Sequence, residues 1–319
     1  MTAESMVNTS IPAVEEPIPK EKFRHVGIDE KKMQAVVRPR TTYWQDAWRR
    51  LKQNRVATAG LILLILMIIM AIVGPMLTPY DATTNYLDNT HQPMSSEHWF
   101  GTDALGRDIW ARAWVGARVS LMIGFLAAFI NAFIGVVVGG IAGYFGGKLD
   151  MIIMRFIDVM ISIPSMIFIV LIMVIVGQGI IPIILSFAIT GWLSMARLVR
   201  GQVLQLKEQE YVMVARTLGA SAGRIIFKHL IPNSLGVVIV NLTMSIPQAI
   251  FTEAFLSLIG IGVKPPTPSW GLLASDGASV LRVYPTELII PAVLISVTML
   301  SLNLLGDGLR DALDPKMRK

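Results

Sequence analysis

Four histidines are the candidates for acid–base catalysis or metal binding in a chain that is 53% hydrophobic. An intramembrane enzyme needs a nucleophile and a base held together at membrane depth, and a paired zinc site on a helix needs two histidines one turn apart. The histidines instead fall singly in predicted tails or loops, and the chain has no cysteine nucleophile or thiolate ligand. We therefore expect no catalysis by this chain alone. The histidines are His25, His91, His98 and His229.

The stretch AGYFGGKLD contains a possible phosphate-binding motif, because Gly147 and Lys148 resemble the end of a P-loop. A P-loop also requires an earlier glycine, where this chain has Ala142, and a Ser or Thr after the lysine, where it has Leu149. The motif is incomplete at both positions. We predict no nucleotide, cofactor or metal site in this chain.

Ionisable residues inside apolar segments usually mark a transport path, because a charge at membrane depth costs about 2.5 to 3.5 kcal/mol on insertion scales. Arg155 and Asp158 are three residues apart and are predicted to neutralise each other on one helix face. Glu253 has no such partner in its own segment. It is predicted either to face a cavity or to lie at the outer interface.

The apolar runs that surround these residues predict an all-α, polytopic membrane protein. Mean hydropathy is +0.59 and only 16% of the residues are charged, and a bilayer core of roughly 30 Å takes about 20 apolar residues to cross as a helix. Six segments are apolar enough, at about 57–77, 119–142, 151–176, 180–198, 234–258 and 286–306. An even number of spans places both chain ends on one side.

Most of the 28 lysines and arginines lie in four stretches, which predicts that these stretches are cytoplasmic. The stretches are residues 1–56, 143–155, 197–232 and 307–319. Both termini are therefore predicted to be cytoplasmic. The net charge of +6 is explained by this topology and by anionic lipid, so we expect no nucleic-acid partner.

The residues before the first span divide into two parts. Residues 1–41 are predicted to form a disordered cytoplasmic tail. Residues 42–56 place Trp44, Ala47, Trp48 and Leu51 on one helical face, with basic residues opposite. This pattern predicts an amphipathic interfacial helix, and residues 57–319 then form the transmembrane domain.

Four glycines spaced four residues apart, Gly135, Gly139, Gly143 and Gly147, form a stripe on the second span. Small residues in such a stripe let another helix approach closely. We favour packing within the chain over a contact with another subunit.

The stretch ARTLGASAGRIIFKHLIP (215–232) interrupts the apolar runs inside the predicted cytoplasmic loop 199–233. Tyr211, Val214, Ala215 and Leu218 form an apolar stripe that precedes it. Gly219 is predicted to end this helix in the left-handed conformation and Ser221 to cap the next. Pro232 is predicted to close the second helix. Such a hairpin either lies back on its own bundle or offers a helix end to a groove in a partner.

The spacing of Ala215, Gly219 and Pro232 resembles the cytoplasmic EAA loop of ABC importer permeases. This chain has Met213-Val214-Ala215 in place of the family's Glu-Ala-Ala, and Glu210 lies one turn earlier as a substitute carboxylate. Three further segments resemble the second permease subunit of oligopeptide and dipeptide importers. They are HWFGTDALGRDIWARAWVGARVSL (98–121), EAFLSLIGIGVKPPTPSWGLLASDG (253–277) and LNLLGDGLRDALDPKMR (302–318).

This resemblance implies the MetI-like fold of type I importers and a place in the bacterial plasma membrane. The implied partners are a homologous second permease, two ATPase subunits that bind ATP and Mg, and an extracytoplasmic peptide-binding protein that delivers the peptide. The two permeases would together form the translocation pathway. The coupling residues carried over from the family or adjoining its motif are Glu210, Ala215, Arg216, Gly219, Ala220, Ser221 and Pro232.

The outer loop, expected at 78–116, is longer than a connector requires. It interleaves tryptophans with charged residues, of which Asp103, Arg107 and Asp108 are candidates for docking the binding protein. Glu253 and Trp270 are candidates for the translocation path or an outer gate. The alternative function is a secondary transporter driven by an ion gradient, although such proteins usually contain more intramembrane carboxylates and internal repeats.

Overall fold

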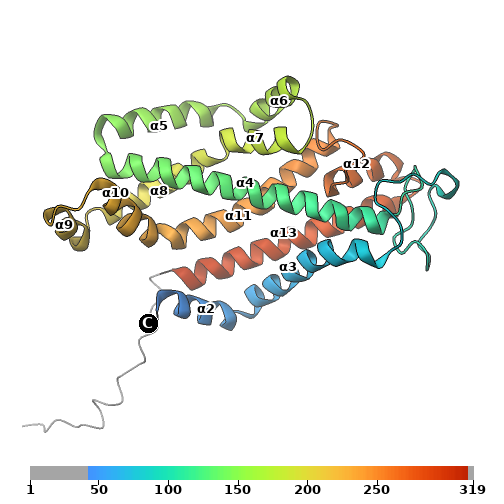
Figure 1. Cartoon of the computed structure of the whole chain (residues 1–319), viewed down its shortest axis with the longest axis horizontal. Helices are drawn as coiled ribbons and strands as arrows, with labels where there is room; N and C mark the ends of the chain where they lie inside the picture. Colours follow the sequence, from blue (N-terminus) through green and yellow to red (C-terminus); the bar gives the residue numbers. More distant parts are fainter. Residues whose placement is uncertain (1–41, 315–319) are drawn as a thin grey trace, which may run out of the picture. The chain divides into compact units, whose positions relative to one another are not determined.

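The computed structural model describes residues 42–314, and almost all the regular structure in this range is helical (Figure 1). Between these limits there is no strand beyond the isolated bridge that pairs Thr102 with Asp108. The predicted disordered tail at residues 1–41 lies outside the described residues. The all-α prediction is confirmed for the part of the chain that is described.

Five helices in the described range are long and apolar enough to cross a membrane, or six if one bent pair counts as a span. α3 (Arg55–Val73) continues through the turn Gly74–Leu77, and α4 covers Ile109–Phe145. The bent pair is α5 (Gly147–Ser162) with α6 (Ser165–Val176). The remaining spans are α7 (Ile180–Thr190) with α8 (Trp192–Leu206), the continuous helix Ala222–Leu258 that ends in α11 (Ile231–Leu258), and α13 (Pro285–Leu313).

The third predicted span is not one straight helix, because α5 and α6 bend by 81° at the break between them. Pro164 causes the break. A proline has no backbone N–H to continue the helix, and it disfavours the helical conformation of the residue before it. Ile163 accordingly has an extended backbone, with φ −92° and ψ 125°.

The second span begins at Ile109, well before the expected position of about 119, so the outer loop ends at Asp108 rather than at 116. Asp108 starts the helix, since its carboxylate accepts a hydrogen bond from the backbone N–H of Ala111 at 2.8 Å. The fourth span is also longer than expected and continues to Leu206 after a break at Gly191. Both differences arise because helices extend past the apolar segment that sequence analysis detects.

The glycine stripe on α4 packs against α8, which confirms the interpretation of packing within the chain for three of its glycines. A Cβ at Gly135 would lie 2.6 Å from the side chain of Met195, and one at Gly143 would lie 2.9 Å from that of Val203. A Cβ at Gly139 would overlap the carbonyl of Ala196. Gly147 is not part of the stripe, because it begins α5 with a positive φ of 56°.

The helix predicted before the first span is present as α2 (Tyr43–Gln53). Ala47 and Leu51 are buried, whereas Trp44 and Trp48 are about half exposed (49% and 51%). α2 contacts α13 and α3, and the Tyr43 hydroxyl donates to the Leu313 carbonyl at 3.1 Å. The small apolar residues of the predicted face therefore pack on the bundle, and the two tryptophans are available to a lipid surface.

Candidate functional site

A helical hairpin at one end of the bundle is built by α9 (Glu210–Thr217) and α10 (Ala222–Ile225), as Figure 1 shows. Gly219 has a φ of +81°, and its N–H bonds to the Arg216 carbonyl at 3.0 Å. The N–H of Ala220 bonds to the Ala215 carbonyl, also at 3.0 Å. These two bonds form a Schellman motif, so the prediction that Gly219 ends the helix is confirmed.

Ser221 begins the second helix as predicted. Its hydroxyl oxygen accepts from the backbone N–H of Arg224 at 3.4 Å, and its own backbone is extended, which is typical of an N-cap. The turn between the helices is therefore only a few residues long, which fixes the direction in which α9 leaves the bundle.

The prediction that Pro232 closes the second helix is wrong. α10 continues through a π-helical turn at Ile226–Leu230 into α11, so Ala222–Leu258 is one continuous helix. Pro232 is among the first residues of α11 but lies inside the continuous helix, directly after the π-helical turn. The wide turn before it is closed by a bond from the Ile231 N–H to the Ile226 carbonyl and marks a defined irregularity between hairpin and span.

One buried side chain anchors α9 to the bundle. Val212 is fully buried and belongs to a core cluster with Ile225, Ile226 and Leu230. The Arg216 guanidinium lies 5.7 Å from the centre of the Tyr144 ring, which adds a cation–π contact to α4. The hairpin is therefore held by the membrane bundle and by its own turn.

The apolar stripe predicted on α9 faces away from the bundle. Tyr211, Val214 and Leu218 are 41%, 57% and 82% exposed, and Phe227 on the following turn is also exposed. Burial by its surroundings raises the pKa of the Tyr211 phenol. One face of the hairpin thus packs back on its own bundle through Val212, and the apolar side chains Tyr211, Val214 and Leu218 are exposed on α9.

The predicted coupling residues all lie on or beside this hairpin. Five of them are exposed: Glu210, Arg216, Gly219, Ser221 and Pro232. Ala215 and Ala220 are half-buried. Sequence analysis missed Val212, whose burial could not be distinguished from that of its apolar neighbours.

Ion pairs fix the helices behind the hairpin. Arg200 on α8 bonds to both carboxylate oxygens of Asp150 on α5, at 2.5 and 2.6 Å. Asp158 accepts from Arg197 on α8 at 2.7 Å. Asp158 therefore pairs with Arg197 on another helix and not, as predicted, with Arg155. Sequence spacing could not indicate this, because it does not show that α8 packs beside Asp158.

Glu253 is fully buried between α4, α11 and α12 (Trp270–Val280). Its carboxylate accepts from the hydroxyls of Ser120 at 2.9 Å, Ser257 at 3.0 Å and Ser269 at 2.7 Å. Trp270 is also fully buried, and its indole N–H donates to the Ala113 carbonyl at 2.9 Å. This packing encloses Glu253 and does not expose it to a cavity, whereas its place at the outer interface stays a prediction. A path or gate role for the two residues stays a prediction.

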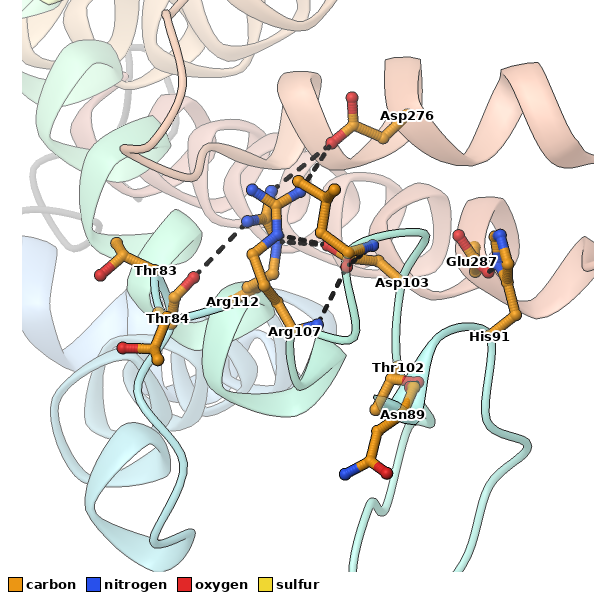
Figure 2. A network of polar contacts seen from close by, with 12 residues as sticks. Thr83, Thr84, Asn89, His91, Thr102, Asp103, Arg107, Arg112, Asp276 and Glu287 are labelled. Atoms are coloured by element: carbon orange, nitrogen blue, oxygen red, sulfur yellow. Dashed lines mark hydrogen bonds and ion pairs between the residues drawn. The ribbon is translucent and has the colours of Figure 1, made fainter. Parts of the chain in front are cut away.

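A buried charged network holds the outer loop, as Figure 2 shows. Asp103 pairs with Arg107 at 2.8 Å and with Arg112 at 3.3 Å, and both arginines reach Asp276 on α12, at 3.8 and 3.5 Å. Burial raises the pKa of the Asp276 carboxyl, while Arg112 and Arg107 act in the opposite direction. The network joins the loop to α4 and α12. Sequence analysis did not identify Arg112 or Asp276 as its members.

Two histidines complete the attachment of the loop. His98 Nδ1 lies 2.8 Å from the Asp108 carboxylate, and His91 Nδ1 lies 2.6 Å from Glu287 on α13. The His91 ring stacks on Tyr284 with centroids 4.0 Å apart. Since Asp103, Arg107 and Asp108 are all buried, their side chains shape the loop and are not presented on its surface.

The turn at the start of the loop is stabilised by Asp81. Its carboxylate accepts from the hydroxyls and backbone N–H groups of Thr83 and Thr84. These bonds lower the pKa of the Asp81 carboxyl to about 2. No group of three or more potential metal ligands occurs among residues 42–314.

Residues 135–319 match the family described as the binding-protein-dependent transport system inner membrane component. Residues 42–93 match the N-terminal TM domain of oligopeptide transport permease C. The chain is 49% identical over 302 residues to the oligopeptide transport system permease protein OppC of Bacillus subtilis (strain 168), covering 95% of this chain and 99% of that protein. It is 47% identical to the dipeptide transport system permease protein DppC of the same strain, with 95% of each chain covered. It is 44% identical to OppC of Escherichia coli (strain K12), covering 86% of this chain and 92% of that protein.

Proposed function

Because the chain belongs to the family of inner membrane components of binding-protein-dependent transport systems, we propose that it is the permease subunit of an ATP-driven peptide importer. Its oligopeptide and dipeptide transport relatives support peptides as the substrate. They also favour this function over a secondary transporter. The subunit crosses the membrane several times and carries no catalytic role of its own.

The subunit forms half of the translocation pathway in the bacterial plasma membrane, and a homologous permease forms the other half. An extracytoplasmic binding protein delivers the peptide, and two ATPase subunits bind ATP and Mg on the opposite side. Both termini and the hairpin of α9 and α10 face the cytoplasm, which agrees with the distribution of lysines and arginines.

The outward apolar face of α9 is the observation that carries the coupling role. A helix that exposes Tyr211, Val214 and Leu218 fits an apolar groove in a partner. Its fixed attachment through Val212 and Arg216 transmits a displacement of the groove to α4, α8 and α11. ATP-driven closure of the ATPases then rocks the spans between outward-open and inward-open arrangements.

Gly219 gives a direct test of docking. No atom lies within 4 Å of a Cβ built at this position, so the side chain of Gly219→Arg projects from the hairpin tip toward the ATPase. We expect normal membrane insertion but loss of ATP-dependent uptake and of ATPase co-purification. Gly219→Asn is the control, because asparagine tolerates a positive φ and is much smaller. Normal uptake by Gly219→Arg would sink the docking proposal.

The outer loop between α3 and α4 is the proposed contact for the binding protein. Its buried network, which includes Asp103, Arg107 and Asp108, supports the shape of that surface. Exposed apolar side chains such as Leu87 (68%) and Trp99 (44%) supply the surface itself. Deletion of residues 84–96 should weaken the binding protein's affinity, measured on the assembled importer. An unchanged affinity would contradict this part of the proposal.

A further inference from the structure

The corner between α4 and α5 lies at the same end of the bundle as the hairpin (Figure 1). α4 ends at Phe145 and α5 begins at Gly147. Gly146 and Gly147 both have a positive φ, of 65° and 56°, which glycine adopts without a steric cost. Of the residues of α5, only Ile157 is buried. Apolar packing therefore does little to fix α5 on the bundle.

Ion pairs supply the remaining attachment of α5, and those found within residues 42–314 all lead to α8. The Arg200 guanidinium bonds to both carboxylate oxygens of Asp150, and the two side chains are only 30% and 13% exposed. The pair of Arg197 with Asp158 has one bond, and both side chains are about half exposed. A bidentate and partly buried pair is stronger than an exposed single bond. Asp150 is therefore the main polar anchor of α5.

Two further cations connect the same corner to the segment that follows Arg200. The Lys207 ammonium, at the end of α8, donates to the Gly143 carbonyl in the last turn of α4 at 3.1 Å, where the helix dipole favours a cation. Arg216 on α9 lies over the Tyr144 ring. Three cations in succession, from α8 into the hairpin, thus contact the corner. A displacement of α8 and α9 therefore acts on the corner as well as on α11.

α5 and α8 also enclose a hollow of about 300 Å³. Ile161, at the opposite end of α5 from Asp150, lines one side of it, and the other side is lined by residues of α8. These residues are Ser194, Arg197 and Leu198. The hollow keeps its shape only while the two helices keep their relative position, which the pair of Asp150 with Arg200 fixes at the cytoplasmic end.

We infer that Asp150 is a positioning residue for coupling, because its pair with Arg200 makes α5 follow α8 when the ATPases displace the hairpin. This inference rests on the proposed function, since it names how the displacement reaches α5. Asp150 takes no part in ATP hydrolysis and acts through Arg200. Without its carboxylate the hairpin still docks, because the outward face of α9 is unchanged, but α5 no longer moves fully with α8. ATP is then hydrolysed without complete transport.

The first test is the number of peptides imported per ATP hydrolysed, measured on the complete importer with its binding protein in proteoliposomes. Asp150→Asn keeps the size of the side chain and removes its charge, so one charge-assisted pair is lost. We expect the ratio to fall by about tenfold, the change that corresponds to the loss of such a pair. Co-purification of the ATPase subunits should be unchanged.

Asp158→Asn is the matched control, because it makes the same chemical change on the same helix but breaks an exposed ion pair. Its ratio should stay within about twofold of the wild type, and Asp150→Glu, which keeps the carboxylate, should restore most of the loss.

Two results of the first test would overturn the inference. One is a loss of uptake and ATP hydrolysis in Asp150→Asn that leaves the ratio unchanged, as a merely structural pair would give. The other is an equal fall of the ratio in Asp150→Asn and Asp158→Asn. Absence of ATP-driven uptake by the wild-type complex would instead overturn the proposed function.

A second test does not depend on the folding of Asp150→Asn. The chain has no cysteine, so Phe156→Cys on α5 and Gln205→Cys on α8, both at exposed positions, can carry a pair of spin labels in the assembled importer. We expect the same distance between the labels in the resting state and in the ATP-bound state. Release of the peptide by the binding protein in the same sample shows that the importer has switched. In Asp150→Asn the ATP-bound distance distribution should broaden.

A distance between the two labels that changes on ATP binding in the otherwise wild-type chain would overturn the inference, since α5 would then not follow α8. A distribution that Asp150→Asn leaves unchanged would also overturn it, because the carboxylate would not be what holds the two helices together.

Discussion

Val212 and Val214 lie two residues apart on α9 and give a matched pair of substitutions. Val212 is fully buried in the bundle, and Val214 is 57% exposed on the outward face. Truncating each to alanine removes the same atoms. The two variants therefore separate attachment of the hairpin from docking of a partner on it.

Val214→Ala should weaken docking of the ATPase subunits by about fivefold in Kd. The truncation removes two methyl groups, each worth about 0.8 kcal/mol when fully buried, and docking can bury only the 57% of the side chain that is now exposed. The loss is then about 1 kcal/mol, which corresponds to about fivefold in affinity. Titration of ATPase subunits onto the permease pair in nanodiscs measures it.

Val212→Ala should act on the attachment instead. Loss of a fully buried valine side chain costs about 2 to 3 kcal/mol, including the cavity that remains. Amide hydrogen exchange in residues 210–220 should therefore accelerate by about 30- to 150-fold if the hairpin opens as a unit. Val214→Ala should leave this exchange unchanged. The reasoning is refuted if Val214→Ala binds the ATPases normally, or if it loosens the hairpin as much as Val212→Ala does.

Three further predictions concern the bundle and the loop. Gly139→Val should lower the thermal stability of the permease by about 3 kcal/mol through overlap with α8, whereas Gly201→Ala, which meets no atom within 4 Å, should be neutral or stabilising in the same melting assay. Glu253→Leu should destabilise the subunit by about 3 kcal/mol, because three buried serine hydroxyls lose their acceptor. Glu253→Gln should lose less stability, because its amide oxygen still accepts hydrogen bonds. A melting temperature of Glu253→Leu equal to that of the wild type would contradict the buried cluster. Asp276→Asn should speed proteolysis of the outer loop at neutral pH by weakening its contacts with Arg107 and Arg112, and an unchanged cleavage rate would show that the network does not hold the loop.

The sequence was sufficient to locate the hairpin because its signals are local. Gly219 and Ser221 determine a C-cap and an N-cap from their own backbone requirements and hydrogen bonds, and both are confirmed. The prediction for Pro232 was wrong, since a proline that ends a helix and one inside a continuing helix look alike in sequence. The π-helical turn before it has no recognisable sequence pattern.

Long-range contacts were not predictable in the same way. Two of the three serines that donate to Glu253 lie on other elements, Ser120 on α4 and Ser269 at the start of α12. Asp158 likewise pairs with Arg197 on another helix rather than with Arg155 one turn away. Residues far apart in sequence meet only after α4, α11 and α12 have packed. The bend at Pro164 was within reach, because a proline near the middle of a predicted span is a known cause of helix breaks.

The most direct test of the account is ATP-dependent peptide uptake by proteoliposomes that contain this subunit with its second permease, ATPase subunits and binding protein. We predict that a labelled peptide accumulates only when the ATPase subunits can hydrolyse ATP. This accumulation should persist when a protonophore and an ionophore collapse all ion gradients. Accumulation by this chain without ATP, driven by an imposed ion gradient and abolished by the protonophore, would contradict the central claim.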